Sequence, residues 1–189
     1  MTAILDIILS YIIGGILLLM ILTVNANLTN TAFQSSLDYQ AETNAMNVGQ
    51  LFEYDFYKIG YHATSLKIAY ADTAAITFNA DLQNVGTVNT VAYSIGTTAD
   101  ATATPNPNDF PLYRQVDGAS AAKSYYGLTW LKFTYYDSSG TQLGTPMTLT
   151  SDLQKIKSIR VQATVQSTFP VDSTYSSSYW EQTFFPMNL

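Results

Sequence analysis

The sequence predicts an α+β fold in which one long N-terminal helix packs against a mostly antiparallel β-sheet head. Two observations support this prediction. Apolar residues fill positions 3–24 and then recur at every third or fourth position as far as Ile59, which is the spacing of one face of a helix. After His62 the period changes to two, the spacing of half-buried strands. The chain is therefore divided into three parts, residues 1–24, 25–61 and 62–189.

The first part is predicted to span a membrane. Segment 3–24 contains a single charged residue, Asp6, and about 20 apolar residues in a helix are enough to cross a hydrocarbon core of roughly 30 Å. A cleavable secretory signal needs a basic start, yet no Lys or Arg precedes Lys58. Cleavage near Asn25-Ala26 is the alternative. We expect a retained single-pass helix with the head on the extracytoplasmic side.

The second part is predicted to continue the same helix as an amphipathic segment. No Pro interrupts residues 1–60, and Gly60 is expected to end a helix of about 58 residues. Gly14 and Gly15 lower helix propensity, so they indicate either close packing between helices or a place where the helix bends. The apolar stripe consists of Phe33, Leu37, Ala41, Ala45, Val48, Phe52, Phe56 and Ile59.

The third part is expected to form the head. The segment Asp137–Gly140 predicts a tight turn that joins 128–136 to 141–149 as a hairpin. Residues 99–111 and 170–178 are expected to be irregular. Segments rich in Val, Ile, Thr, Phe and Tyr predict strands at 65–70, 76–80, 87–95, 127–136, 156–166 and 179–185. One antiparallel sheet on the upper half of the helix is the expected product.

The composition argues against several classes of function. A net charge of −6 with eight scattered Lys and Arg residues does not fit nucleic-acid binding. The chain has no Cys and one histidine, His62, which we expect at the surface or at a boundary. These residues form no metal cluster, no cofactor site and no nucleophile–base pair. We therefore predict no catalytic residues, no metal and no enzymatic activity.

Five segments carry a resemblance to a known family. Glu53–Tyr61 closes the predicted helix with an acidic, basic, Gly and Tyr pattern, and Ile76–Leu82 with Val91–Ser94 forms a first hairpin. Leu112–Arg114 and Leu131–Gly140 follow in the head. In this order the segments resemble the type IV pilins and pseudopilins, in particular the larger minor pilins and the pseudopilins of type II secretion. The resemblance covers nearly the whole chain.

The resemblance implies a structural subunit of an extracellular filament or pseudopilus. Such a protein is held in the membrane by its apolar helix, is assembled by inner-membrane machinery, and then packs against copies of itself or other pilins. It implies that Asp6 pairs with the α-amino group of a neighbouring subunit. Gly14 and Gly15 would allow the helices to approach closely. From the sequence alone, Asp6 at the interface, favouring the helix dipole, is an equal alternative.

The N-terminus departs from the family pattern. Precursors of that family carry a basic leader and then a Phe-Thr-Leu-Ile-Glu motif, whereas this chain starts Met1-Thr2-Ala3-Ile4-Leu5-Asp6. Either Met1 is the methylated first residue of a processed chain, or loss of the initiator Met places Asp6 fifth. Both explanations give Asp6 a role in assembly, and the first gives Met1 a role as well.

Aromatic residues near predicted loops are the candidates for surface binding, although packing explains most of the 14 Tyr and two Trp. The alternative function is a monomeric, membrane-anchored β-domain that binds a ligand or a partner protein. It shares the helix and the head with a filament subunit but does not require Asp6 to meet another copy. The residues selected for surface binding are Tyr125, Tyr126, Tyr175, Tyr179 and Trp180.

Overall fold

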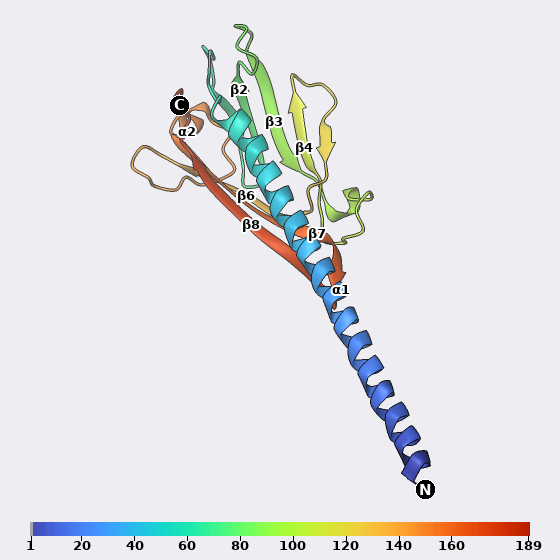
Figure 1. Ribbon diagram of the computed structural model, residues 1–189. Coiled ribbons are helices and arrows are strands. Elements are labelled where there is room, and N and C mark those ends of the chain that lie inside the picture. Colours follow the sequence, from blue (N-terminus) through green and yellow to red (C-terminus); the bar gives the residue numbers. More distant parts are fainter. Residues whose placement is uncertain (1) are drawn as a thin grey trace.

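The computed structural model describes residues 2–189 and places one long helix beneath and beside a β-rich head (Figure 1). The predicted α+β architecture is confirmed. Met1 lies outside the described residues. The elements in chain order are α1 (Thr2–Phe56), β1 (Ile68–Ala71), β2 (Ala75–Ala80), β3 (Asn89–Ile95), η1 (Thr98–Asp100), β4 (Leu112–Val116), β5 (Ala122–Ser124), β6 (Leu128–Tyr136), α2 (Thr150–Leu153), β7 (Ser158–Val171) and β8 (Thr174–Phe184).

Helix α1 is a single unbroken element of 55 residues that passes through Gly14 and Gly15. It ends at Phe56, slightly before the predicted end, and turn residues then carry the chain to Gly60. Gly60 has a φ of +77°, a conformation that residues with a Cβ rarely adopt. Its N–H donates to the carbonyl oxygen of Asn79, so the exit from the helix is tied to β2.

The head contains two antiparallel sheets instead of the single sheet predicted. Strands β1 to β5 form a five-stranded sheet in chain order, and β6, β7 and β8 form a three-stranded sheet. Both are meanders in which each strand pairs with its sequence neighbour. The turn between β1 and β2 contacts the second sheet, because the Phe133 N–H of β6 donates to the Thr73 carbonyl oxygen at 2.8 Å.

The predicted hairpin partner of β6 is wrong. The Asp137 carboxylate accepts hydrogen bonds from the N–H groups of Ser139 and Thr141, so the tight turn forms. After it, residues 141–149 make only isolated bridges, Tyr136 with Gln142 and Met147 with Ala71. The long partner of β6 is β7, whose alternating Val and Ala residues bury one face.

Residues 170–178 are also not irregular, because most of them belong to β7 and β8. The first residue of β6, Leu128, pairs with Val165, so the part of β7 after Val165 is paired with β8 only. Pro170 is tolerated there because no second strand needs its N–H. The strands β4 and β5 were not among the predicted strands. The expected irregular segment 99–111 is confirmed apart from its overlap with the short helix η1.

The core lies where the upper part of α1 meets both sheets. Every predicted stripe residue from Leu37 onward is buried, whereas Phe33 remains 49% exposed. The Phe56 ring packs edge-on against Phe78 of the first sheet and Phe184 of the second. Burying such aromatic side chains stabilises the fold by about 1.5 to 3 kcal/mol each. The helix therefore holds the two sheets together.

Candidate assembly and membrane surface

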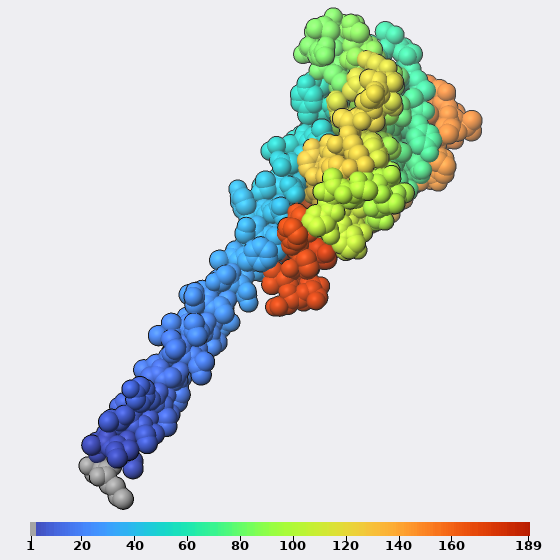
Figure 2. Space-filling view, turned by 90° about the vertical axis from the view of Figure 1, so that its right-hand side faces the viewer, coloured from blue at the N-terminus to red at the C-terminus, as the bar shows by residue number. Residues whose placement is uncertain are grey.

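The lower part of α1 stands away from the head. Residues 3–33, here called the free half, are all exposed, and the first partly covered residue is Gln34. Figure 2 shows this segment projecting from the head as a single rod. Its large apolar side chains between positions 4 and 28 are 48% to 79% exposed. An apolar surface of this extent needs a lipid or protein partner, because monomeric soluble proteins seldom leave one in water.

The same helix is long and apolar enough to cross a membrane. Among the described residues it is the one helix that meets this criterion, and the apolar stretch is not buried inside the structure. A core helix of a soluble protein would be covered by its own domain. The exposed state of the free half therefore agrees with a transmembrane segment.

Asp6 is the single charged residue in segment 3–24. It lies on the exposed helix surface, and the Ser10 hydroxyl donates to its backbone carbonyl oxygen at 2.8 Å. No salt bridge to Asp6 forms within the described residues. Gly14 and Gly15 have no other atom within 4 Å of where a Cβ would lie. Met1, the proposed pairing partner from another copy, lies outside the described residues.

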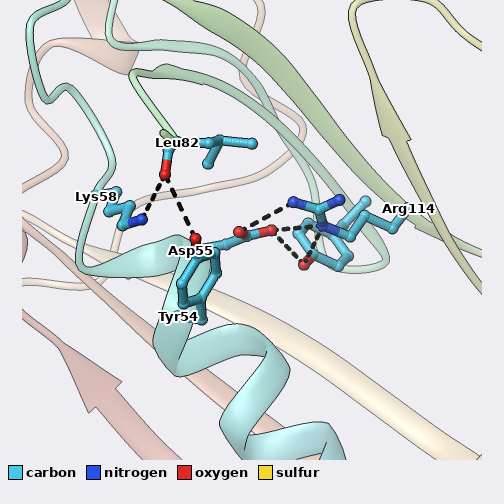
Figure 3. A network of polar contacts seen from close by, with 6 residues as sticks. Tyr54, Asp55, Lys58, Leu82 and Arg114 are labelled. Carbon is cyan, nitrogen blue, oxygen red and sulfur yellow. Dashed lines mark hydrogen bonds and ion pairs between the residues drawn. The ribbon is translucent and has the colours of Figure 1, made fainter. Parts of the chain in front are cut away.

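The packed half, residues 34–56, ends in a buried ion pair that the sequence reasoning missed. The Asp55 carboxylate is fully buried and accepts hydrogen bonds from Arg114 Nε at 2.7 Å and from the Tyr93 hydroxyl at 2.6 Å. Figure 3 shows Asp55 on the last turn of the helix pointing towards Arg114. The signal was present in the sequence, because Asp55 occupies a position on the apolar stripe between Phe52 and Ile59.

Charge and burial shift the pKa values of the groups around Asp55. The hydrogen bond that Arg114 donates to Asp55 raises the pKa of the guanidinium, which stays charged. Burial, followed by the negative charge of Asp55, raises the pKa of the Tyr93 hydroxyl well above its ordinary value. Arg114 lies on β4 and Tyr93 on β3, so the pair fixes the end of α1 to the five-stranded sheet.

A second carboxylate secures the chain just after the helix. Asp81 is buried and accepts hydrogen bonds from His62 Nδ1 and from the Gly86 N–H, at 2.8 and 2.7 Å. Desolvation opposes ionisation, but these bonds and those from the Val85 and Gln83 N–H groups outweigh it and lower the pKa of Asp81 to about 2. The half-exposed His62 therefore lies at the surface and serves a structural hydrogen bond.

The residues selected for surface binding do not form one patch. Tyr125 and Tyr126 are partly buried at the start of the chain segment that leads into β6, and Tyr126 packs on the core. Trp180 packs against α1, with its ring stacked on Phe52 at a centroid distance of 6.4 Å. Tyr179 is 56% exposed and bonds to Glu181 on its own strand. Tyr175 lies at the start of β8.

A buried carboxylate in the head has an oxygen without a hydrogen-bond partner. Asp109 lies in the 99–111 segment and is almost fully buried, and its Oδ1 has no hydrogen-bond partner. Burial raises its pKa to about 6, opposed in part by a hydrogen bond from Thr104. Within residues 2–189 no group of three or more His, Cys, Asp or Glu is arranged to hold a metal ion. Asp109 therefore belongs to no such group.

No protein-family model matches this chain, and no curated protein matches it significantly.

Proposed function

We propose that this protein is a structural subunit of a type IV pilus-like filament or pseudopilus. The observation that carries the proposal is the free half of α1, a continuous apolar helical surface that its own head leaves uncovered. A subunit of this kind uses one surface twice. Lipid covers the free half before assembly, and the helices of neighbouring subunits cover it afterwards.

The position of Asp6 supports assembly over simple anchoring. A carboxylate within an apolar span costs about 2.5 to 3.5 kcal/mol when central, and such residues usually have a partner. A plain membrane anchor gains nothing from this cost. A positively charged group on another copy would offset it and would also fix the register between adjacent helices. The resemblance assigns that role to the α-amino group of Met1.

The two glycines support close packing of the free half. The structure keeps Gly14 and Gly15 within regular helix, with open space over both. Because lipid tails are as apolar as Leu, helices associate in a membrane or filament core through close contact, and small residues permit it. Gly14 and Gly15 lower the helix propensity, but they are also the positions where a neighbouring helix can approach most closely.

The alternative function is a monomeric, membrane-anchored β-domain that binds a ligand or a partner protein. The exposed aromatic Tyr179 on β8 is the observation that favours it. This alternative uses the free half only as an anchor. Asp6 and the glycines then have no role beyond the helix itself.

The test is electron microscopy of material sheared from cells that express the full chain, with the subunit identified by mass spectrometry and its N-terminal residue sequenced. We expect thin fibres that contain the chain. Asp6→Ala should abolish the fibres while the protein remains in the membrane fraction, because losing the charge makes insertion easier. Asp6→Glu should restore fibres in part.

The matched control is Asp38→Ala, which removes an exposed acid from the same helix above the free half. It should leave the fibres unchanged. Fibres that persist in Asp6→Ala would contradict the pairing role. A wild-type chain found only as a membrane-bound monomer would reject the filament subunit and favour the anchored β-domain.

A further inference from the structure

The hairpin formed by β7 and β8 extends along α1 towards the membrane-spanning segment. Trp180 lies over Gly49, and the Ser176 hydroxyl, further towards the start of β8, accepts a hydrogen bond from Gln34 Nε2 at 2.7 Å. The order of these contacts shows that the hairpin runs down the helix. Its end, residues 168–175, is here called the hairpin tip. Figure 2 shows it in red-orange beside the helix, at the edge of the head nearest the free half.

Polar contacts hold the hairpin tip in this position. The Thr168 N–H donates to Gln40 Oε1 at 3.2 Å, which ties β7 to the helix. The buried Ser167 hydroxyl accepts from the Ser176 N–H and donates to the Phe169 carbonyl oxygen. The hairpin tip is thus fixed to α1 from both of its strands, and its height above the membrane is set by the helix.

That height can be calculated from regular geometry. Gln34 lies ten residues after Val24, the last residue of the apolar segment, which is about 15 Å along a helix. The hairpin tip continues beyond Ser176 by about three residue pairs, or about 10 Å. It ends about 5 Å above the hydrocarbon boundary. The headgroup layer of a bilayer is roughly 5 to 7 Å thick on each side.

The side chains of the hairpin tip suit that layer. Phe169 is 51% exposed on β7, in the stretch where the register with β8 shifts. Val171 and Tyr175 are only partly covered. Aromatic residues are enriched at membrane–water interfaces. Asp172 is the single charged residue between positions 161 and 180. A contact of this composition would not depend on anionic lipids.

We infer that the hairpin tip rests in the headgroup layer of the bilayer that α1 enters, as a second membrane contact of the unassembled subunit. The inference rests on the membrane-spanning helix of the proposed function but not on filament assembly. Its partner is a zwitterionic lipid surface, recognised by Phe169 and Tyr175. The contact orients the head over the membrane by holding it at two points.

Single-cysteine labelling tests the inference, because the natural chain has no Cys. The full chain carrying Thr174→Cys and an environment-sensitive fluorophore is reconstituted in phosphatidylcholine vesicles that contain lipids with a nitroxide on the headgroup. We expect at least about twofold stronger quenching than for Ser120→Cys, which lies in the turn between β4 and β5. Figure 1 shows that turn at the end of the head away from the N-terminus.

Two further variants make the result decisive. Adding Phe169→Ser to Thr174→Cys should remove at least half of the extra quenching, whereas Phe185→Ser, which removes another exposed phenylalanine, should not. Replacing part of the phosphatidylcholine by an anionic lipid should weaken the contact through Asp172. Equal quenching at positions 174 and 120 would overturn the inference and leave the hairpin tip as a contact between copies.

An Ile13→Cys label separates this inference from the proposed function. It should be quenched by nitroxides deep in the acyl chains, since Ile13 lies near the middle of segment 3–24. Quenching at position 13 without quenching at 174 overturns the membrane contact alone. Absence of quenching at position 13 overturns the membrane-spanning helix and the inference with it.

Discussion

The two halves of α1 belong to one helix but differ in how far the head covers them. The packed half, residues 34–56, carries an apolar stripe that the two sheets cover, and most of its remaining positions are exposed or half-exposed. The free half, residues 3–33, is apolar almost all round through segment 3–24, and the head covers none of it. A stripe matches a partner on one side, whereas an apolar surface all round matches lipid or a ring of neighbouring helices. The difference indicates that the packed half folds the protein, and it agrees with our proposal that the free half serves assembly.

Their carboxylates differ in the same way. Asp55 is buried and satisfied within its own chain, so its role is complete in the monomer. Asp6 has no salt-bridge partner among residues 2–189. A substitution at Asp55 should therefore act on stability and one at Asp6 on assembly.

The largest effect on stability is expected from Asp55→Ala. It leaves the Arg114 charge and the Tyr93 hydroxyl without their partner, and breaking a buried ion pair in this way costs about 3 to 5 kcal/mol. Because the Arg114 side chain is 26% exposed and water can reach it, we expect the lower end of that range. Denaturant unfolding in detergent, followed by near-ultraviolet circular dichroism of the head, measures the change.

Two variants sharpen this prediction. Asp55→Ala with Arg114→Met should recover part of the lost stability, because no unpaired charge remains in the double variant. Asp38→Ala, at an exposed position on the same half, should change stability by less than about 0.5 kcal/mol. An effect of Asp38→Ala as large as that of Asp55→Ala would show that burial does not distinguish the two acids.

A smaller effect is expected from Gly49→Ala. A Cβ on Gly49 would lie 2.6 Å from Trp180 Nε1, and the indole is held between α1 and neighbouring rings, so β8 must move away from the helix. Such overpacking costs about 1 to 3 kcal/mol, offset by about 1 kcal/mol of gained helix propensity. The net destabilisation, about 1 kcal/mol, is measured by denaturant unfolding.

Gly14→Ala is the matched variant in the free half. It meets no atom within 4 Å, so the unfolding of the head should be unchanged. Fibre yield should fall, because the added methyl group separates the packed helices that we propose. A Gly14→Ala variant that destabilises the head would contradict the independence of the two halves.

A last effect is expected from pH and concerns Asp81, which lies just beyond the packed half. The pKa of Asp81 is lowered from 3.8 to about 2, so its ionised form stabilises the fold above pH 4. That contribution is lost as the pH falls from about 4 towards 2. The thermal midpoint of the head should decrease over this window, and Asp81→Asn should flatten the decrease.

The helix content of the free half should not follow that transition, because its hydrogen bonds lie within the helix. Far-ultraviolet circular dichroism in detergent separates this persisting helical signal from the head. A midpoint that falls equally in Asp81→Asn would assign the pH dependence to another carboxylate.

The sequence predicted the structure best where a single hydrophobic repeat continued over many residues. The length of α1 and the stripe from Leu37 to Ile59 were predicted because a 3.6-residue repeat over many turns has no competing explanation. Phe33 matches the repeat but is exposed, because periodicity shows the direction of a side chain and not where the covering domain ends. The alternation in β7 likewise predicted a strand with one buried face.

The head was less predictable because its pairing depends on distant segments. A good turn at Asp137–Gly140 predicted a local hairpin, yet β6 found a longer and more apolar partner in β7. Pro170 indicated a loop, although a strand paired on one side accepts it. The Asp55–Arg114 pair joins residues 59 positions apart, and no short-range pattern connects them.

Because α1 is unbroken, a tilt at one end of the helix displaces its other end. A helix of 55 residues is about 82 Å long, and no break separates the apolar segment 3–24 from the part packed in the head. A tilt of about 20° at the membrane, an average value for such helices, carries the far end sideways by about 28 Å. A load applied to the head would pass to the apolar end through one rod, and β8, which packs along that rod, would bear it in shear.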